Sequence, residues 1–324
     1  MIRYKADDFE RLTLERVQVL LEEQGCAIGL VDPDEYQEWK KVLPNCVSKS
    51  SLVDFEENPL RYKMALDAGV SKSSAGFKLG GAVDAAVLTP EVFARKYWYE
   101  PKEVKICANG KPHAGGHQSD EQKARWAERE ARGDVMLKVE ELKLVSDIAM
   151  AVSAHLEKLG LLPGESCLTQ VAMFVRVEAV NNVMLPAAVT VCGMLDVLPL
   201  EDPVLLDLKT TSRGVSEQGI NYALCDYSYG VQAAMYADLY QICTGEDEGR
   251  RFAFLFADTV APHQTRLAWV PATLMVAYRA RYQAALEHFS RCVASGDWGG
   301  LQLPDMDYNP PRYELNKLGV NFNF

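Results

Sequence analysis

The sequence predicts an α/β protein whose mixed central β-sheet is flanked by helices and preceded by a helical region. Helical periodicity fills the first part of the chain, and several apolar runs of strand length follow between residues 171 and 209. A helix, two more strands and a long helix complete the order. The chain has 324 residues, of which 48% are hydrophobic and 24% charged. This composition is ordinary for a globular protein, and the length allows one elaborated domain or two.

The first half of the chain is expected to be mainly helical. Residues 6–24 place Phe9 and Val17 on the apolar side of an amphipathic helix, and residues 32–34 begin a second short helix. Further helices are expected over residues 50–66, 80–88, 121–132 and 139–159. Residues 101–121 are rich in Gly, Pro and Lys, so we expect a loop there.

The second half of the chain supplies the sheet. The expected core strands cover residues 171–177, 188–191, 195–198 and 204–209. Residues 199–203 are bounded by prolines, which suits a hairpin turn between the last two strands. A helix over 227–242, strands over 252–257 and 265–270, and a helix over 271–294 are expected to follow.

Two aspartates and a lysine stand at the ends of the strands in this hairpin. Asp207 and Lys209 are two residues apart in one strand, so they share a face, and the hairpin would bring Asp196 beside them. Two carboxylates in an apolar sheet are costly without a counter-ion, and a divalent metal removes that cost. Such a metal also lowers the pKa of a bound water enough to make a nucleophile. The pattern therefore predicts a metal-dependent hydrolytic site.

Four further segments accompany this pattern in a fixed order. They are Ser48-Lys49-Ser50-Ser51-Leu52 with Asn58-Pro59-Leu60-Arg61-Tyr62-Lys63, the expected helix of residues 79–90, Gln232-x3-Tyr236, and Trp298 after Ser295-Gly296. Together with the aspartates and the lysine, they resemble the PD-(D/E)XK nuclease superfamily, and more closely its RecE-type (exonuclease VIII-like) phage and prophage exodeoxyribonucleases. The resemblance runs from about Glu35 to Leu303, and the ordered set is more specific than the aspartate–lysine pattern alone.

The resemblance implies a restriction-endonuclease-like core over residues 46–303, an N-terminal helical extension over 1–45 and a C-terminal tail over 304–324. It implies metal ligation by Asp84, Asp196, Asp207 and the carbonyl of Leu208, and catalytic roles for Lys209, Asp207, Asp196, Gln232 and Tyr236. The expected ion is Mg²⁺, with Mn²⁺ as the alternative. The implied activity is 5′-to-3′ digestion of linear double-stranded DNA in phage-type recombination. The implied assembly is a ring-shaped homo-oligomer with a single-strand annealing protein as partner.

The chain departs from the family pattern at two positions. Asp84 stands in place of a histidine, and Gln170 stands in place of a glutamate. Aspartate is a hard oxygen ligand and can keep a metal-binding role, whereas glutamine is neutral and a weaker ligand. Gly80 and Gly81 would let the helix that carries Asp84 approach the sheet closely.

Each site residue also has a structural interpretation. Asp207 and Lys209 could form an ordinary strand-end salt bridge, and Asp84 could be a hydrogen-bonded structural aspartate. Gln232 and Tyr236, one helical turn apart, could be a buried polar pair. At the level of function, the alternatives are another PD-(D/E)XK nuclease, such as an endonuclease or a single-strand exonuclease, and a catalytically weakened DNA-end-binding protein.

Charge and hydropathy exclude some classes of protein. The net charge of −11 and the pI of about 5.1 argue against nucleic-acid binding through an all-over basic surface, but they permit a local basic groove. No apolar run reaches the roughly 18 residues needed to cross a membrane, and the N-terminus shows no apolar signal segment. We therefore expect a cytoplasmic protein with no membrane partner.

The remaining metal-type and basic residues are expected to be structural. The eight cysteines show no metal-binding spacing and are expected to be buried reduced thiols. His113 and His117 are expected to be loop residues, because Gly and Pro surround them. The basic stretch from Lys105 to Arg132 is interleaved with glutamates, which is typical of a solvated helix face.

Overall fold

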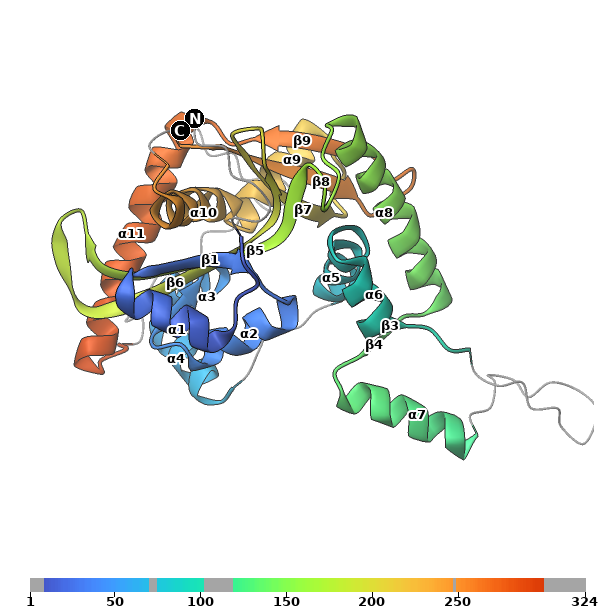
Figure 1. Cartoon of the computed structure of the whole chain (residues 1–324), viewed down its shortest axis with the longest axis horizontal. Helices are drawn as coiled ribbons and strands as arrows, with labels where there is room; N and C mark the ends of the chain where they lie inside the picture. The colour runs from blue at the N-terminus through green and yellow to red at the C-terminus, as the bar shows by residue number, and fades with distance from the viewer. Residues whose placement is uncertain (1–8, 70–74, 102–118, 247–248, 300–324) are drawn as a thin grey trace, which may run out of the picture.

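The computed structural model describes residues 9–69, 75–101, 119–246 and 249–299. Within these residues, the centre is a seven-stranded mixed sheet in the order β1-β5-β6-β7-β8-β9, with β2 paired to β6 (Figure 1). Its strands are β1 (Cys26–Leu30), β2 (Cys46–Ser48), β5 (Cys167–Val180), β6 (Val183–Pro199), β7 (Val204–Thr211), β8 (Arg251–Asp258) and β9 (Thr265–Trp269). A small parallel pair joins β3 (Tyr97–Trp98) to β4 (Val135–Met136). The predicted α/β class with a mixed central sheet is confirmed.

Helices cover both faces of this sheet. The helices of the described residues are α1 (Leu14–Glu23), α2 (Pro33–Val42), α3 (Lys49–Glu57), α4 (Pro59–Asp67), α5 (Ala75–Leu88), α6 (Pro90–Lys96), α7 (Asp120–Ala131), α8 (Val139–Lys158), α9 (Glu217–Asp226), α10 (Tyr229–Thr244) and α11 (Ala272–Ser295). Helices α5 and α8 pack together on one face, and α10 and α11 pack together on the other (Figure 1). The central strands are therefore buried between two helical layers.

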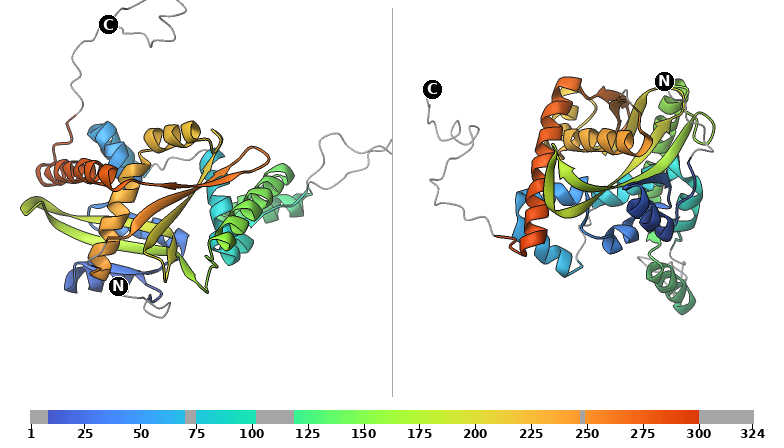
Figure 2. Two further views of the ribbon diagram at one scale, coloured as in Figure 1. Left: turned by 90° about the horizontal axis from the view of Figure 1, so that it is seen from above. Right: turned by 60° about the vertical axis from the view of Figure 1, so that its left-hand side comes forward.

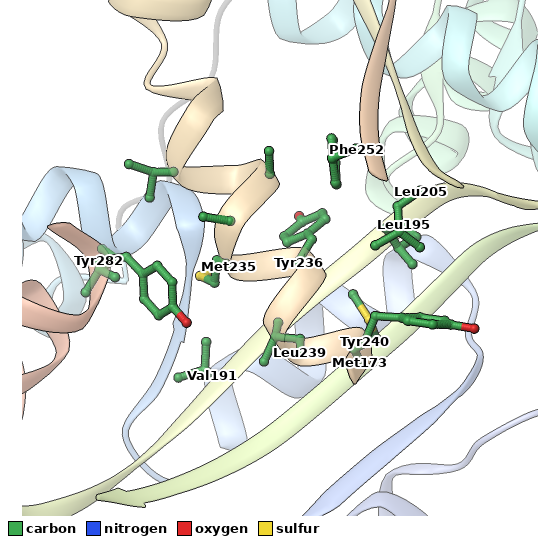
Figure 3. Close-up of a cluster of buried hydrophobic side chains, with 14 of the residues drawn as sticks. Met173, Val191, Leu195, Leu205, Met235, Tyr236, Leu239, Tyr240, Phe252 and Tyr282 are labelled. Atoms are coloured by element: carbon green, nitrogen blue, oxygen red, sulfur yellow. The ribbon is translucent and has the colours of Figure 1, made fainter. Parts of the chain in front are cut away.

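Strand β8 shows why the chain needs an unbroken apolar run here. Its side chains on the α10 face are Phe252, Phe254 and Phe256, and those on the α8 face are Ala253, Leu255 and Ala257. Successive side chains of a strand alternate between faces, so a strand buried on both faces is apolar throughout. Figure 3 shows the α10 side of this core, where Tyr236 and Leu239 lie against the strands.

Strand β6 organises the site because two strands share one of its edges. Its other edge pairs with β5 in a long hairpin, whose turn at Asn181 and Asn182 is left-handed at both residues and projects beyond the helices (Figures 1 and 2). On the shared edge, β2 pairs in parallel with residues 190–192, and β7 pairs antiparallel with Val197 opposite Leu206. Asp196 lies next to the point where β7 joins, so the polar side chains collect beside a junction of three strands.

Most predicted elements are present, and the differences have local causes. The helix predicted over 6–24 begins only at Leu14, because Thr13 caps it and Arg11 forms a β-bridge with Leu30. The helix predicted over 50–66 is two helices, because Asn58 is extended before Pro59. The strands predicted at 188–191 and 195–198 are one continuous strand, β6.

Six elements of the described residues have no counterpart among the predictions: the short strands β1, β2, β3 and β4 and the helices α6 and α9. Strand β1 adds the N-terminal region to the edge of the main sheet through β5, and α9 precedes α10. The domain boundaries at 1–45, 46–303 and 304–324 stay predictions, and the C-terminal tail lies outside the described residues. So do His113 and His117 and most of the loop predicted over 101–121.

The described residues also bear on two simpler expectations. None of the described helices is both long and apolar enough to pass through a bilayer. The seven cysteines in the described part of the chain are free thiols, and Cys225 is exposed whereas Cys167, Cys192 and Cys292 are buried as expected.

Candidate active site

Strand β7 supplies the centre of the site. Asp207 is 1% exposed, and its Oδ1 accepts a hydrogen bond of 2.5 Å from Nε2 of Gln232 on α10. Its Oδ2 forms an ion pair with Nζ of Lys209, two residues along the same face of the strand, but has no partner of hydrogen-bond geometry. Burial opposes the charge of Lys209, but Asp207 and Asp196 outweigh it and raise the pKa of this lysine above its ordinary value.

Asp196 on β6 lies across the strand junction from Asp207. Its Oδ2 accepts a hydrogen bond of 2.8 Å from the backbone N–H of Leu208, so the hairpin predicted from residues 195–209 brings these positions together. Burial, and then the charges of Asp207 and Asp84, raise the pKa of Asp196 well above its ordinary value. The contact with Leu208 is through its N–H, so a ligand role for the Leu208 carbonyl stays a prediction.

Gln170 on β5 also contacts Asp196. Its Nε2 lies 3.4 Å from Asp196 Oδ1, and its backbone is left-handed with φ of 55°. This conformation costs a non-glycine residue roughly 1–2 kcal/mol, so the kink must be held by its surroundings. The position that departs from the family's glutamate is therefore at the site, where it presents a neutral amide to a carboxylate.

Asp84 reaches the site from α5, on the opposite face of the sheet from α10. It lines the same cleft as Asp196 and Asp207. Two glycines allow this approach, because a Cβ at Gly80 would lie 3.3 Å from Thr210 Oγ1 and one at Gly81 would lie 3.2 Å from Tyr97 Oη. Burial raises the pKa of Asp84 to about 7, although the charge of Lys209 lowers it, while Asp207 raises it further.

Tyr236 lies one turn after Gln232 on α10, as the sequence spacing predicts. Its ring packs directly over Gly193 of β6, where a Cβ would come within 2.6 Å of the ring. Burial, and then the charge of Asp207, raise the pKa of Tyr236, so the phenol is neutral. Gly193 therefore sets how closely α10 can approach the strand that carries Asp196.

These side chains line one cleft, with a volume of about 480 Å³. It brings together all of the predicted side chains: Asp84, Asp196, Asp207, Lys209, Gln232 and Tyr236. The cleft also includes residues that were not predicted from the sequence to belong to the site: Tyr36 and Lys40 of α2, Lys49 of α3, Lys96 of α6 and Tyr97 of β3. Only Lys49 had a signal, since it lies inside the serine-rich segment that supports the family resemblance.

Lys49 is the lysine of the cleft that shares an aromatic contact with Lys209. Its Nζ donates a hydrogen bond to the carbonyl oxygen of Tyr227 and lies 5.1 Å from the ring centroid of Tyr229. Lys209 Nζ lies 5.1 Å from the same ring. Burial, and then the charge of Lys209, lower the pKa of Lys49 to about 8. The two ammonium groups therefore share one aromatic ring.

The chemistry of the donor set fits a hard divalent cation. Three buried or half-buried carboxylates converge, two with raised pKa, and a buried oxygen of Asp207 lacks a hydrogen bond. As the side chains stand, no three His, Cys, Asp or Glu residues of the described ranges form a group that could hold a metal ion. The ammonium of Lys209 contacts Asp207 Oδ2. The predicted ligand set remains a prediction.

Comparisons with known proteins agree with this geometry. Residues 173–300 match the model of a family described as a PDDEXK-like domain of unknown function (DUF3799). These residues include the strands and the helix that carry Asp196, Asp207, Lys209, Gln232 and Tyr236. Asp84 and Gln170 lie outside the matched range. A search among curated proteins gives no match.

The fold is also similar to that of solved structures. A crystal structure described as a "Putative exonuclease" from Eubacterium rectale aligns with a TM-score of 0.54 and 14% identity, over 88% of this chain and 97% of that chain. A phage related exonuclease from Haemophilus somnus aligns with a TM-score of 0.30 and 13% identity, over 61% of this chain and 91% of that chain. The first likeness concerns the fold alone, and the second is too weak to support an argument. With the family match, the fold identifies a PD-(D/E)XK-like domain in this chain, so the predicted resemblance to the PD-(D/E)XK nuclease superfamily is confirmed.

Proposed function

We propose that this protein is a metal-dependent deoxyribonuclease that digests linear double-stranded DNA from its ends in the 5′-to-3′ direction. The observation that carries the proposal is the convergence of Asp196, Asp207 and Lys209 at one strand junction. This is the constellation of a PD-(D/E)XK domain, whose members generally use divalent metals. A nuclease fold of this kind implies DNA as substrate. The end preference and the polarity rest on the resemblance to RecE-type exonucleases.

The roles of the residues follow from their charges. Asp84, Asp196, Asp207 and the Leu208 carbonyl would hold Mg²⁺, or Mn²⁺ as the alternative. When bound, such an ion polarises the phosphodiester and supplies a nucleophile at neutral pH. Lys209 moves from Asp207 to the phosphate and stabilises the charge that develops on it. Gln232 keeps Asp207 oriented through the bond to Oδ1, and neutral Tyr236 fixes α10 against β6.

The proposed biological context also rests on the resemblance. A ring-shaped homo-oligomer would hold the acidic exterior of this chain, with its net charge of −11, away from the DNA in the channel. A single-strand annealing protein would bind the 3′ strands that such an enzyme leaves, in phage-type recombination in the cytoplasm.

A catalytically weakened DNA-end-binding protein is the second candidate, and two observations favour it. The amide of Gln170 stands where the family has a carboxylate, which lowers the negative charge available to a metal. The carboxylates are already engaged by Lys209, Gln232 and the N–H of Leu208. An endonuclease of the same superfamily is the third.

One experiment separates the three. End-labelled linear duplex and covalently closed circular DNA are incubated with the protein and Mg²⁺, or with EDTA as control. Loss of label from linear DNA alone supports an exonuclease, and the labelled strand gives its polarity. Cutting of the circle supports an endonuclease. Retention of the linear DNA in a protein complex, without Mg²⁺-dependent cutting, would support the binding protein and overturn the proposed function.

A further inference from the structure

Beside the catalytic groups, the exposed Tyr227 extends a row of aromatic rings and cations from the cleft toward the surface. The ring of Tyr229 lies 5.1 Å from Lys209 Nζ and 5.5 Å from the ring of Tyr227, tilted by 34°. Tyr227 is 53% exposed. The guanidinium of Arg213 lies 5.9 Å from the centroid of the Tyr227 ring. A stepwise path of rings and cations therefore leads from the catalytic lysine to the surface.

The backbone between the two tyrosines is held in an unfavourable conformation. Ser228 is left-handed, with φ of 50° and ψ of 41°, although it is not a glycine. Arg281 of α11 holds it, because Nη1 lies 3.3 Å from Ser228 Oγ while Nε and Nη2 bind both carboxylate oxygens of Glu56. Strained residues that are braced in this way are concentrated at functional sites. The brace fixes the direction in which the two rings point.

Lys49 ties the same turn to the cleft. Its ammonium donates to the carbonyl oxygen of Tyr227, and it also lines the cleft that contains Asp207 and Lys209. An ammonium has three donors, and one is used by this carbonyl. The turn, the cation and the exposed ring therefore form one unit next to the place where a phosphate would react.

We propose that Tyr227, Tyr229 and Lys49 form a subsite for the nucleotide that adjoins the scissile phosphate. The ring of Tyr227 stacks on the base, Lys49 contacts the backbone phosphate, and Tyr229 supports both side chains. An exposed ring beside cations is the arrangement by which proteins hold unpaired nucleotides without reading sequence. The subsite rests on the proposed nuclease function and deepens it, since it requires the end of the substrate to be unpaired when it enters.

The first test measures binding of the whole protein to fluorescent single-stranded oligonucleotides, in the presence of Ca²⁺ or EDTA so that no cutting occurs. Tyr227→Ala is expected to weaken binding by roughly 5- to 100-fold, the range of one base–aromatic stack, and Tyr227→Phe is expected to keep most of it. The matched control is Tyr222→Ala, because Tyr222 is 54% exposed on α9, the helix that ends just before Tyr227. This control should bind like the wild type.

The second test identifies the base as the partner of Tyr227. Oligonucleotides with one abasic position, moved through the three terminal nucleotides, are titrated against both proteins. At one abasic position, the wild type should lose as much binding free energy as the Tyr227→Ala substitution costs with the intact oligonucleotide. The Tyr227→Ala variant should lose no further binding free energy at that position. Equal losses for both proteins at every position would overturn the subsite.

The third test concerns Lys49. Lys49→Met keeps the apolar stem and is expected to weaken binding and reduce its salt dependence by about one ion, as for a lost phosphate contact. An unchanged salt dependence would overturn its role. If the wild type cuts linear DNA but Tyr227→Ala binds every oligonucleotide like the wild type, the subsite is wrong and the proposed function stands. If the wild type neither binds nor cuts DNA, both are wrong.

Discussion

The cleft contains two groups of side chains that differ in how their charges are balanced. The carboxylate group consists of Asp84, Asp196 and Asp207, which come from α5, β6 and β7. The lysine–tyrosine group consists of Lys49 and Lys209, whose ammonium groups each lie 5.1 Å from the ring centroid of Tyr229. The carboxylates have one nearby ammonium in contact, that of Lys209. The lysines, in contrast, have a ring, a carbonyl oxygen and a carboxylate as partners.

This difference indicates the charge of the ligand that each group would bind. The raised pKa values of Asp84 and Asp196 indicate that neighbouring groups of the protein do not fully compensate the negative charge of these two carboxylates. A dication would remove that deficit, and Lys209 would then be free for an anion. The lysines need no ligand to be stable, but each keeps donors that a phosphate could use. The two groups therefore suit a metal and a phosphate side by side.

The largest expected effect comes from breaking the carboxylate group. Asp207→Asn and Asp196→Asn should each lower Mg²⁺-dependent DNA hydrolysis by roughly 10³-fold or more, because each removes a charge that holds the ion. Asparagine still offers an oxygen to Gln232 or to the N–H of Leu208, so the fold should survive. Hydrolysis of end-labelled DNA measures the loss, and circular dichroism checks the fold. Asp202→Asn, an exposed aspartate in the β6–β7 turn, is the control.

Replacement of Lys209 distinguishes the role of the lysine–tyrosine group from that of the carboxylate group. Lys209→Ala should lower turnover by about 10²-fold or more, because the ammonium acts on charge that develops in the transition state. Metal affinity should not fall, because the change removes a competitor for Asp207 Oδ2. Single-turnover rates at saturating Mg²⁺ and calorimetric metal titration give the two quantities. A variant that loses metal binding but keeps its turnover would contradict this role.

The sequence revealed the carboxylate group far better than the lysine–tyrosine group. Asp196, Asp207 and Lys209 lie within fourteen residues in one hairpin, so strand alternation and the turn place them together. Gln232 and Tyr236 follow from helical spacing. Lys49 meets Tyr227 and Tyr229 across about 180 residues of sequence, and no local periodicity encodes that contact. The strained turn at Ser228 depends on Arg281, which lies 53 residues further along the chain on another helix.

The fold shows the same limit. Unbroken apolar runs predicted β7 and β8, and helical periodicity predicted α11. Neither pattern predicted β1, because a five-residue strand at a sheet edge gains its stability from pairing with β5. Gln170 was found only through the family resemblance, and its left-handed backbone has no signal in the sequence.

Asp84 tests whether α5 belongs to the carboxylate group in function. Asp84→Asn should raise the Mg²⁺ concentration needed for half-maximal activity, by about tenfold, because a neutral amide gives up the charge that favours a hard dication. Asp84→His should restore part of the activity, more with Mn²⁺ than with Mg²⁺, because imidazole suits Mn²⁺ better. Metal titrations of the hydrolysis rate for both variants decide this. Unchanged metal dependence in Asp84→Asn would make Asp84 a structural aspartate.

The smallest expected effect is a pH dependence of stability. In the metal-free protein the pKa of Asp84 is about 7, above its ordinary value near 4. The folded state therefore holds a proton that the unfolded state has released, and the metal-free fold loses stability as pH rises from about 4 to about 7. Above that range Asp84 is ionised in both states, and its own contribution to the loss is constant.

A bound metal must displace this proton, so the stabilisation by Mg²⁺ should grow as pH rises toward 7 and then level off. Thermal unfolding midpoints with and without Mg²⁺, at pH 5.5, 6.5, 7.5 and 8.5, measure the effect. Asp84→Asn should flatten the curve, because the amide has no proton to lose and one charge near Asp196 is gone. Asp202→Asn should leave it unchanged. If Mg²⁺ raises the midpoint equally at pH 5.5 and 8.5, the buried carboxylates are not the metal site. In that case the lysines alone must balance the negative charge of the carboxylates in the cleft.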